Sequence, residues 1–198
     1  MGGGVVKLHP ESAKMFVVDE AVEKAKAIID EIKSFDSKSP FKGLALVYAM
    51  LIEKQNDAAL IQVNSVLTES PAQPEALKIK ALMLLQQDNK EEAVAAYQTY
   101  YQHYPKDHQT AFILARLLTD LNKTADAEPI IDKLLAINDQ HEVLNQLKGL
   151  ARFNDKDYQK ALEYTNKAVN VNSSNSAARI IAGSSAYFIK NYELASQH

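Results

Sequence analysis

The fold is decided by the pattern in residues 142–175, which read EVLNQLKGLARFNDKDYQKALEYTNKAVNVNSSN. Gly149 and Ala161 in this stretch belong to two series of small residues that recur every 34 positions. One series is Ala59, Ala93, Ala127, Ala161 and Ala195, and the other is Val47, Ala81, Ala115, Gly149 and Gly183, in which only valine is larger. Two apolar or nearly apolar series keep the same period, namely Val63, Tyr97, Ile131, Thr165 and Val66, Tyr100, Leu134, Ala168. Four series in phase indicate an internal repeat.

A unit of this length has room for two helices of about a dozen residues and two short turns. Neither helix can bury its apolar stripe alone, so successive hairpins must stack on one another. Small residues such as Ala115 and Gly149 would let the partner helix cross closely, because a larger side chain would hold the two axes apart. The period therefore predicts an all-α fold of stacked, antiparallel helix hairpins.

Proline marks the ends of two predicted helices. The residue before a proline disfavours helical geometry, so Ser70-Pro71 and Tyr104-Pro105 should each close a second helix. Pro129 lies about one turn inside its predicted helix, which predicts either a late start or a kink there.

Short polar side chains mark where helices begin. Such side chains can accept the free amide hydrogens of a first helical turn, so Asn89, Asp157 and Asn191 should begin second helices. Ser39-Pro40 combines a capping hydroxyl with a proline suited to the first helical position. These signals divide each repeat into two helices.

Composition narrows the classes of protein and partner. The 198 residues are 46% hydrophobic and 24% charged, as in an ordinary globular protein. The formal net charge is -3, with both signs mixed along the chain, which argues against nucleic acid as a partner. The chain contains no cysteine, so disulfides and thiolate sites are excluded. Its longest apolar run, residues 43–52, is shorter than the roughly 20 residues that cross a bilayer, so we predict no transmembrane segment.

The repeat resembles that of the tetratricopeptide repeat family, which has small residues at its eighth, twentieth and often twenty-seventh positions and proline at its thirty-second. The resemblance implies a right-handed α-α superhelix, a tetratricopeptide solenoid. It covers residues 40–198, with repeats at 40–73, 74–107, 108–141, 142–175 and a truncated 176–198. The large residue expected at the fourth position is Leu77 in one repeat but Gly43, Ala111, Asn145 and Arg179 in the others, and Asp139 and Ser173 stand where proline is expected.

The two ends of the chain depart from the repeat. Residues 1–9 are expected to be a disordered leader or one derived from cloning, and residues 10–39 a degenerate hairpin or capping helix. Met15–Val18 could be strand or helix. The last repeat stops inside its second helix, so we expect the chain to be a segment of a longer solenoid whose C-terminal end frays or self-associates.

A narrower resemblance concerns residues 134–195, LLAINDQHEVLNQLKGLARFNDKDYQKALEYTNKAVNVNSSNSAARIIAGSSAYFIKNYELA. This run is similar to the tetratricopeptide lipoproteins of exopolysaccharide and exosortase (PEP-CTERM) systems of Gram-negative bacteria. The resemblance implies a periplasmic or membrane-associated assembly role for the parent protein. Without it, the location would be cytoplasmic.

No catalytic or metal-binding pattern stands out. His103 and His108 are separated by a proline, and no HExxH arrangement exists. Gly183-Ser184-Ser185 lies in a predicted helix and lacks the flanking glycines of a nucleophile elbow. Glycines 2–4 open no nucleotide-binding unit. We therefore predict no catalytic residue, metal or cofactor, and expect a protein that is not an enzyme.

Partner-facing positions follow from the tetratricopeptide resemblance. In this family the first helices of the repeats line a concave groove, with partner-facing residues near positions 2, 5, 9, 12 and 13. The predicted groove residues are Leu44, Tyr48, Leu51, Lys78, Leu82, Leu85, Phe112, Arg116, Gln146, Leu150, Phe153 and Tyr187, with Ile52, Gln86, Thr119, Asp120, Asn154, Ile180, Ser184 and Phe188 beside them. The family's carboxylate clamp is not predicted, because Leu82 stands where asparagine would be needed.

An apolar, aromatic groove suits an amphipathic helix or an extended apolar peptide. The same side chains could instead pack inside the superhelix or against further repeats. The leading hypothesis is a non-catalytic scaffold that binds a protein or peptide in the groove. The alternative is a self-associating assembly element, such as one of an exopolysaccharide or protein-sorting system. An enzymatic role would need residues outside this chain.

Overall fold

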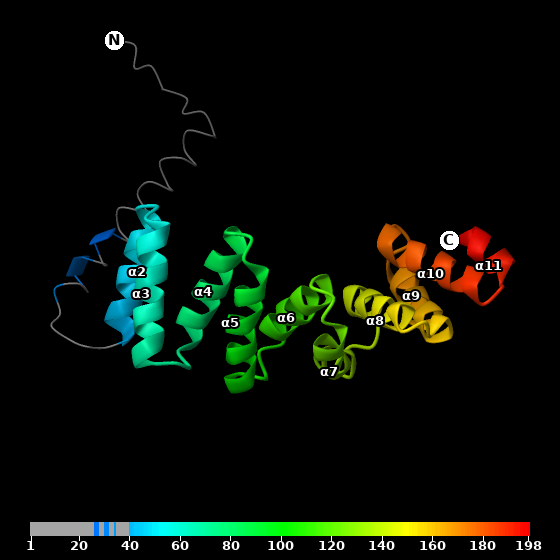
Figure 1. Cartoon of the computed structure of the whole chain (residues 1–198), viewed down its shortest axis with the longest axis horizontal. Helices are drawn as coiled ribbons and strands as arrows, with labels where there is room; N and C mark the ends of the chain where they lie inside the picture. The colour runs from blue at the N-terminus through cyan, green and yellow to red at the C-terminus, as the bar shows by residue number, and fades with distance from the viewer. Residues whose placement is uncertain (1–25, 28–29, 32–33, 35–39) are drawn as a thin grey trace, which may run out of the picture. The chain divides into compact units, whose positions relative to one another are not determined.

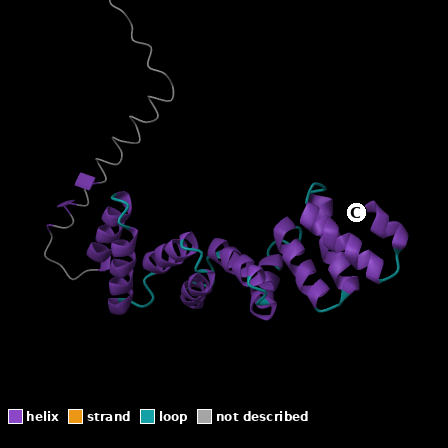
Figure 2. Ribbon diagram, turned by 45° about the horizontal axis from the view of Figure 1, so that its top comes forward, coloured by secondary structure: helices purple, strands orange, loops and turns teal. Residues whose placement is uncertain are grey.

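The computed structural model describes residues 26–27, 30–31, 34 and 40–198. Within these residues ten helices have defined bounds and no strand is present (Figure 2). The helices are α2 (Pro40–Ile52), α3 (Asn56–Glu69), α4 (Pro74–Gln86), α5 (Lys90–His103), α6 (His108–Asp120), α7 (Thr124–Leu135), α8 (Glu142–Asn154), α9 (Tyr158–Val171), α10 (Ser176–Phe188) and α11 (Tyr192–Gln197). The predictions for residues 1–9, Met15–Val18 and Ser39 lie outside the described residues, and of the segment 10–39 the described residues are helical.

The chain forms two compact units, Met1–Gln87 and Asp88–His198. In the first unit α2 packs on α3 and α3 on α4, and Figure 1 shows α2 and α3 side by side. In the second unit the hairpins α6–α7, α8–α9 and α10–α11 pack helix against helix. The all-α fold expected from the period, a tetratricopeptide-type solenoid of antiparallel hairpins, is confirmed.

Helix boundaries keep the period of the sequence. The first helices begin at Pro40, Pro74, His108, Glu142 and Ser176, and the second helices at Asn56, Lys90, Thr124, Tyr158 and Tyr192, so both series advance by 34 residues. The regularity follows from the turn chemistry, because each turn stops one helix and starts the next at a fixed position.

One residue with positive φ shapes each turn inside a hairpin. At Lys156 φ is 62°, and the N–H groups of Lys156 and Asp157 donate to the carbonyls of Phe153 and Arg152, both at 2.9 Å. These two bonds satisfy carbonyl groups that the end of α8 would otherwise leave free. The positive-φ residues are Lys54, Asp88, Asn122, Lys156 and Lys190, and none is glycine.

The next residue in the turn caps the second helix. Asp157 Oδ1 accepts a hydrogen bond from the N–H of Lys160 at 3.2 Å. That bond, followed by the nearby Lys160 and Arg152 charges, holds the pKa of the Asp157 carboxyl below its usual value. Asn89 and Asn191 cap α5 and α11 in the same way, so all three predicted caps are confirmed.

The ends of the second helices also agree with the prediction. Ser70 and Tyr104 are the C-terminal capping residues of α3 and α5, each followed by a proline. The caps of α4, α6, α8 and α10 were not predicted. Their capping side chains each accept a backbone N–H three residues on, and they are Gln73, Asp107, His141 and Asn175.

Helix α7 is the irregular element. It begins at Thr124, in register with the other second helices, so the expected late start at Pro129 is wrong, while a kink there stays a prediction. The helix ends at Leu135, earlier in its repeat than α3, α5 and α9, and no proline closes it. Asn145 holds the following loop instead, because its Nδ2 donates to the carbonyls of Asp139 at 2.8 Å and His141 at 3.1 Å.

The core follows the small-residue series. Ala59, Ala93, Ala127 and Ala161 are buried, as are Val47, Ala81, Ala115 and Gly149 in the first helices. A Cβ added to Gly149 would collide with Thr165 Cγ2 on α9. The close helix crossing expected at this glycine is therefore present.

Candidate functional site

The first helices form neighbouring surfaces within each unit. In the second unit α8 contacts both α6 and α10, the first helices of the adjacent hairpins. In the first unit Tyr48 on α2 donates its hydroxyl to Glu75 Oε1 on α4 at 2.7 Å. Burial and the Glu75 carboxylate raise the pKa of Tyr48 to about 12. The phenol that donates this hydrogen bond is therefore neutral.

The predicted groove residues differ in exposure. Tyr48 (41%), Leu82 (52%) and Tyr187 (60%) are exposed. Arg116 is also exposed, and the half-buried members are Leu51, Lys78, Leu85, Phe112, Gln146, Leu150 and Phe153. Leu44 is 6% exposed and packs in the core with Val47 and Val63, so its side chain is not available to a partner.

Phe112 lines an apolar pocket in the second unit. The pocket has a volume of about 290 Å³ and lies where α6, the end of α7 and the start of α8 meet. Its lining residues are His108, Gln109, Phe112, Leu134, Ile137, Asn138, His141 and Leu144. The Phe112 and His141 rings are 5.2 Å apart, and His141 Nδ1 accepts the N–H of Leu144 at 3.4 Å. The long α7–α8 loop, with exposed Ile137, forms one wall.

Five aromatic residues form a second feature, which we call the aromatic ladder: Phe153, Tyr158, Tyr187, Phe188 and Tyr192. The Phe188 ring stacks on Tyr158 at 4.5 Å and lies 6.0 Å from Phe153. Tyr187 meets Phe188 at 5.9 Å and Tyr192 at 5.6 Å. The ladder therefore runs along the turn ends of the α8–α9 and α10–α11 hairpins.

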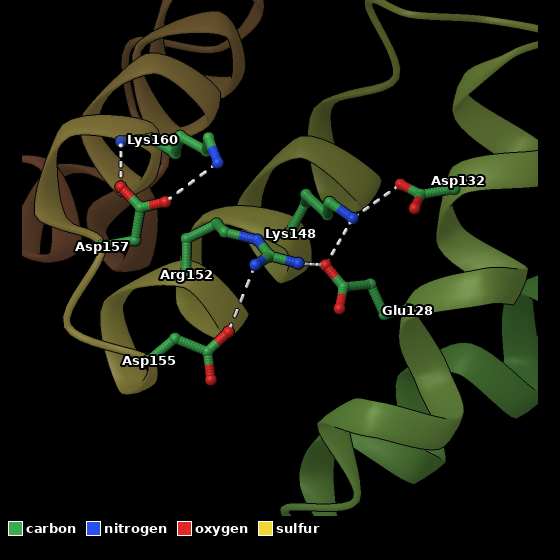
Figure 3. Close-up of polar contacts among 7 residues, drawn as sticks. All are labelled: Glu128, Asp132, Lys148, Arg152, Asp155, Asp157 and Lys160. Atoms are coloured by element: carbon green, nitrogen blue, oxygen red, sulfur yellow. Dashed lines mark hydrogen bonds and ion pairs between the residues drawn. The ribbon is translucent and has the colours of Figure 1, made fainter.

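Charged residues gather between α7 and α8 (Figure 3). Lys148 is 5% exposed, and its Nζ lies 2.6 Å from Glu128 Oε1 and 2.7 Å from Asp132 Oδ1. Arg152, one turn further along α8, pairs with Glu128 and, at 3.3 Å, with Asp155. Because each charge in this cluster has an opposite partner, it serves to join two hairpins and is not a free ligand site.

Sequence reasoning missed several of these residues. Tyr158 and Tyr192 begin second helices and so fell outside the predicted groove, although their spacing matches that of Phe153 and Tyr187. The pocket at Phe112 could not be predicted, because it depends on the early end of α7, which no sequence signal marked. The ion cluster could not be predicted either, because it depends on the register of α7 against α8.

Metal and membrane features can be checked in the described part of the chain. There, no group of three or more His, Cys, Asp or Glu side chains is arranged to hold a metal ion. The helices with defined bounds include none with the length and apolarity needed to span a membrane.

Sequence-family models match most of the repeat region. Two models described as tetratricopeptide repeat match residues 53–108 and 84–151. A model described as anaphase-promoting complex, cyclosome, subunit 3 matches residues 123–198. Together with the helix hairpins, these matches show that the chain contains tetratricopeptide repeats. No significant match is found among curated proteins.

Solved structures share the fold at low sequence identity. MamA 41-end from Desulfovibrio magneticus RS-1 is 17% identical, with a TM-score of 0.67 over 82% of this chain and 92% of that one. YrrB, described as a TPR protein with an unusual peptide-binding site, is 14% identical, with a TM-score of 0.71 over 88% of each chain. Pseudomonas aeruginosa pilF is 17% identical, with a TM-score of 0.61 over 92% of this chain and 83% of that one. At these identities the likeness concerns the fold.

Proposed function

We propose that the protein is a non-catalytic scaffold that binds a peptide or an amphipathic helix of a partner protein on its first-helix surfaces. The observation that carries the proposal is the set of exposed apolar side chains on first helices: Tyr48, Leu82, Ile180, Tyr187 and Phe188. Exposed apolar area costs free energy in water, and a partner that covers it removes that cost. The peptide-binding site named for YrrB supports the proposal by analogy of fold.

The pocket at Phe112 would supply an anchor point. Its lining is mostly apolar, and its volume of about 290 Å³ accommodates one large side chain of a bound segment. A buried anchor of this kind contributes most of the affinity in many interfaces, while surrounding contacts exclude water.

A peptide-display selection on the full chain tests the proposal. Peptides retained by the chain are then titrated against Leu82→Ser and Phe112→Ala, which alter first-helix surfaces in the two units. The matched controls are Ile61→Ser on α3 and Val171→Ser on α9, because both side chains are exposed and apolar but lie on second helices. We expect at least one first-helix variant to weaken binding about tenfold, with both controls unchanged.

The proposal fails if all four variants bind the selected peptides as the parent chain does. Binding lost in the controls but kept in the first-helix variants would place the site on the second helices. Circular dichroism of each variant separates a lost contact from a lost fold.

Self-association is the second candidate function. It is favoured by the exposure of Tyr187, Phe188 and Tyr192 on the last two described helices. Sedimentation velocity over a hundredfold range of protein concentration distinguishes the two roles, because only an assembling chain changes its sedimentation coefficient with concentration.

The resemblance to exopolysaccharide-system lipoproteins extends the proposal to a place in the cell. A parent protein of that kind would act at the envelope, where a repeat scaffold could hold components of an assembly together. Fractionation of cells that express the parent gene tests this, and a purely cytoplasmic protein would contradict it.

A further inference from the structure

The imidazole of His141 has a defined tautomer, because one of its nitrogens caps a helix. His141 Nδ1 accepts the N–H of Leu144 at 3.4 Å, at the start of α8. At the equivalent positions of α6 and α10, Asp107 and Asn175 cap with an oxygen. A ring nitrogen that accepts a hydrogen bond carries no proton, so the neutral imidazole has its proton on Nε2. His141 Nε2–H is therefore a hydrogen-bond donor.

This donor is free to bind a ligand. Within the described part of the chain, no hydrogen bond or ion pair joins His141 Nε2 to another protein group. The side chain is half-buried, and Nε2 does not belong to the fully buried side-chain atoms that lack a partner. An acceptor from outside can consequently reach it.

The same ring forms one wall of the pocket at Phe112. The Phe112 and His141 rings are 5.2 Å apart at an interplanar angle of 44°, and Leu134, Ile137 and Leu144 provide apolar lining. Among the described residues that line the pocket, none is aspartate, glutamate, lysine or arginine. A charged group would lose its hydration there without meeting an opposite charge, so the pocket favours a neutral ligand. Its few polar groups would fix the orientation of that ligand.

The wall and the donor together select one kind of side chain. Aromatic rings pack favourably against the Phe112 and His141 rings. Phenylalanine offers no acceptor to Nε2–H, and the indole N–H of tryptophan only donates, whereas the phenolic oxygen of tyrosine accepts. We propose that the pocket at Phe112 binds a tyrosine side chain of a partner protein, whose phenolic oxygen accepts a hydrogen bond from His141 Nε2–H. This inference rests on the proposed scaffold role and names the residue that anchors the partner.

Side-chain analogues test the inference without a known partner sequence. The probes are p-cresol, toluene and 3-methylindole, which are the side chains of tyrosine, phenylalanine and tryptophan. Each is titrated into the full chain, and the amide chemical shifts of Leu144 and its neighbours report binding. We expect p-cresol to bind about threefold to tenfold more tightly than the other two, which is the net effect of one hydrogen bond. Equal affinities for p-cresol and toluene overturn the inference.

His141→Asn isolates the donor from the cap. Asparagine caps α10 at the equivalent position, so this variant should keep the start of α8 intact, as circular dichroism will verify. The asparagine side chain ends short of the place that Nε2 takes in the imidazole. The preference for p-cresol over toluene should therefore disappear, while toluene still binds. A preference that survives in His141→Asn overturns the inference.

Phe112→Leu is the matched control, because it removes a ring from the pocket but leaves the donor of His141 in place. Both p-cresol and toluene should bind this variant more weakly, and the ratio of their affinities should stay as in the parent chain. A ratio that falls to one in Phe112→Leu as well would show that the ring contact, and not Nε2–H, sets the preference, which overturns the inference.

Further outcomes separate this inference from the scaffold role. If display-selected peptides require Phe112 but bind equally well with phenylalanine in place of tyrosine, the tyrosine preference is wrong and the scaffold role stands. If p-cresol binds selectively while no displayed peptide is retained, the tyrosine preference stands and the scaffold role fails. If the chain dimerises on sedimentation and p-cresol dissociates the dimer, a second copy supplies the tyrosine, which overturns the assignment to a partner protein.

Discussion

Gly149 and Gly183 occupy equivalent positions in successive hairpins but have different surroundings. A Cβ at Gly149 would collide with Thr165 Cγ2, and Thr165 cannot turn away because its hydroxyl donates to the Ala161 carbonyl at 2.7 Å. A Cβ at Gly183 would meet Ala195 O at 3.5 Å and His198 Cβ at 3.4 Å, which is ordinary contact.

Alanine at the two glycines should therefore change stability in opposite directions. Gly149→Ala gains about 1 kcal/mol of helix propensity, but overpacking costs about 1–3 kcal/mol, so we expect net destabilisation. Gly183→Ala keeps the propensity gain without the overpacking and should stabilise by about 0.5–1 kcal/mol. Urea denaturation of both variants measures the signs, and a stabilised Gly149→Ala would show that the hairpin can widen freely.

The lysines with positive φ should lower the stability of the folded chain. A non-glycine residue in the left-handed region costs about 1–2 kcal/mol. Glycine avoids this cost, but part of the gain is offset because glycine loses more chain entropy on folding. Lys156→Gly should therefore raise the free energy of unfolding by about 0.5–1 kcal/mol. Glu163→Gly, an exposed site within α9, should lower it by about 1 kcal/mol. A Lys156→Gly protein less stable than the parent would mean that the lysine side chain makes a favourable contact.

At the scale of elements, the α7–α8 junction is the least conventional part of the fold. An ordinary turn of this family ends with proline, whereas here Asp139 takes that place and Asn145 bonds to the Asp139 carbonyl. Asp139 in place of proline and Asn145 in place of a large residue are the two departures from the repeat pattern here, and one hydrogen bond joins them. The longer loop leaves space for the pocket at Phe112. Beside it, the ion cluster joins α7 and α8.

Glu128 should be the member of the cluster that matters most for stability. Its side chain is 25% exposed and pairs with both Lys148 and Arg152, whereas Asp132 is 56% exposed and pairs with Lys148. Glu128→Ala would leave a buried ammonium short of a partner, and we expect a loss of about 2–3 kcal/mol. Asp132→Ala should cost less than about 1 kcal/mol. Chemical denaturation of the pair of variants checks this order, and equal losses would contradict the assignment of Glu128 as the hub.

At the scale of the whole molecule, packing is local along the chain. Within each unit, the described helices that pack closely together are adjacent, or next but one, in sequence. A linear array of this kind distributes stability over neighbouring interfaces, so a defect in one hairpin should not spread far.

Hydrogen exchange tests that locality. Gly43→Ala would place a Cβ against Val66, so it should lower amide protection in α2 and α3 and leave α8 and α9 unchanged. Gly149→Ala should do the reverse. Uniform loss of protection along the chain in either variant would show a single cooperative unit.

The repeat, the hairpins and most of the turns could be predicted from the sequence alone, because they depend on local signals that recur along the chain. The positions of Asn89, Asp157 and Asn191 sufficed to place three helix starts, since a cap acts on its own first turn. The sequence did not indicate which helices carry exposed apolar residues, since Ile61 and Val171 are exposed on second helices, and it assigned buried Leu44 to the groove.

Which side chains meet across helices depends on the tertiary structure. Lys148 and Glu128 are 20 residues apart, and Tyr158 and Phe188 are 30 apart, so no local pattern couples them. Their contacts depend on the crossing of packed helices, and the pocket at Phe112 depends on where α7 happens to end. Period and capping are properties of a chain segment, whereas a binding surface is a property of how segments pack.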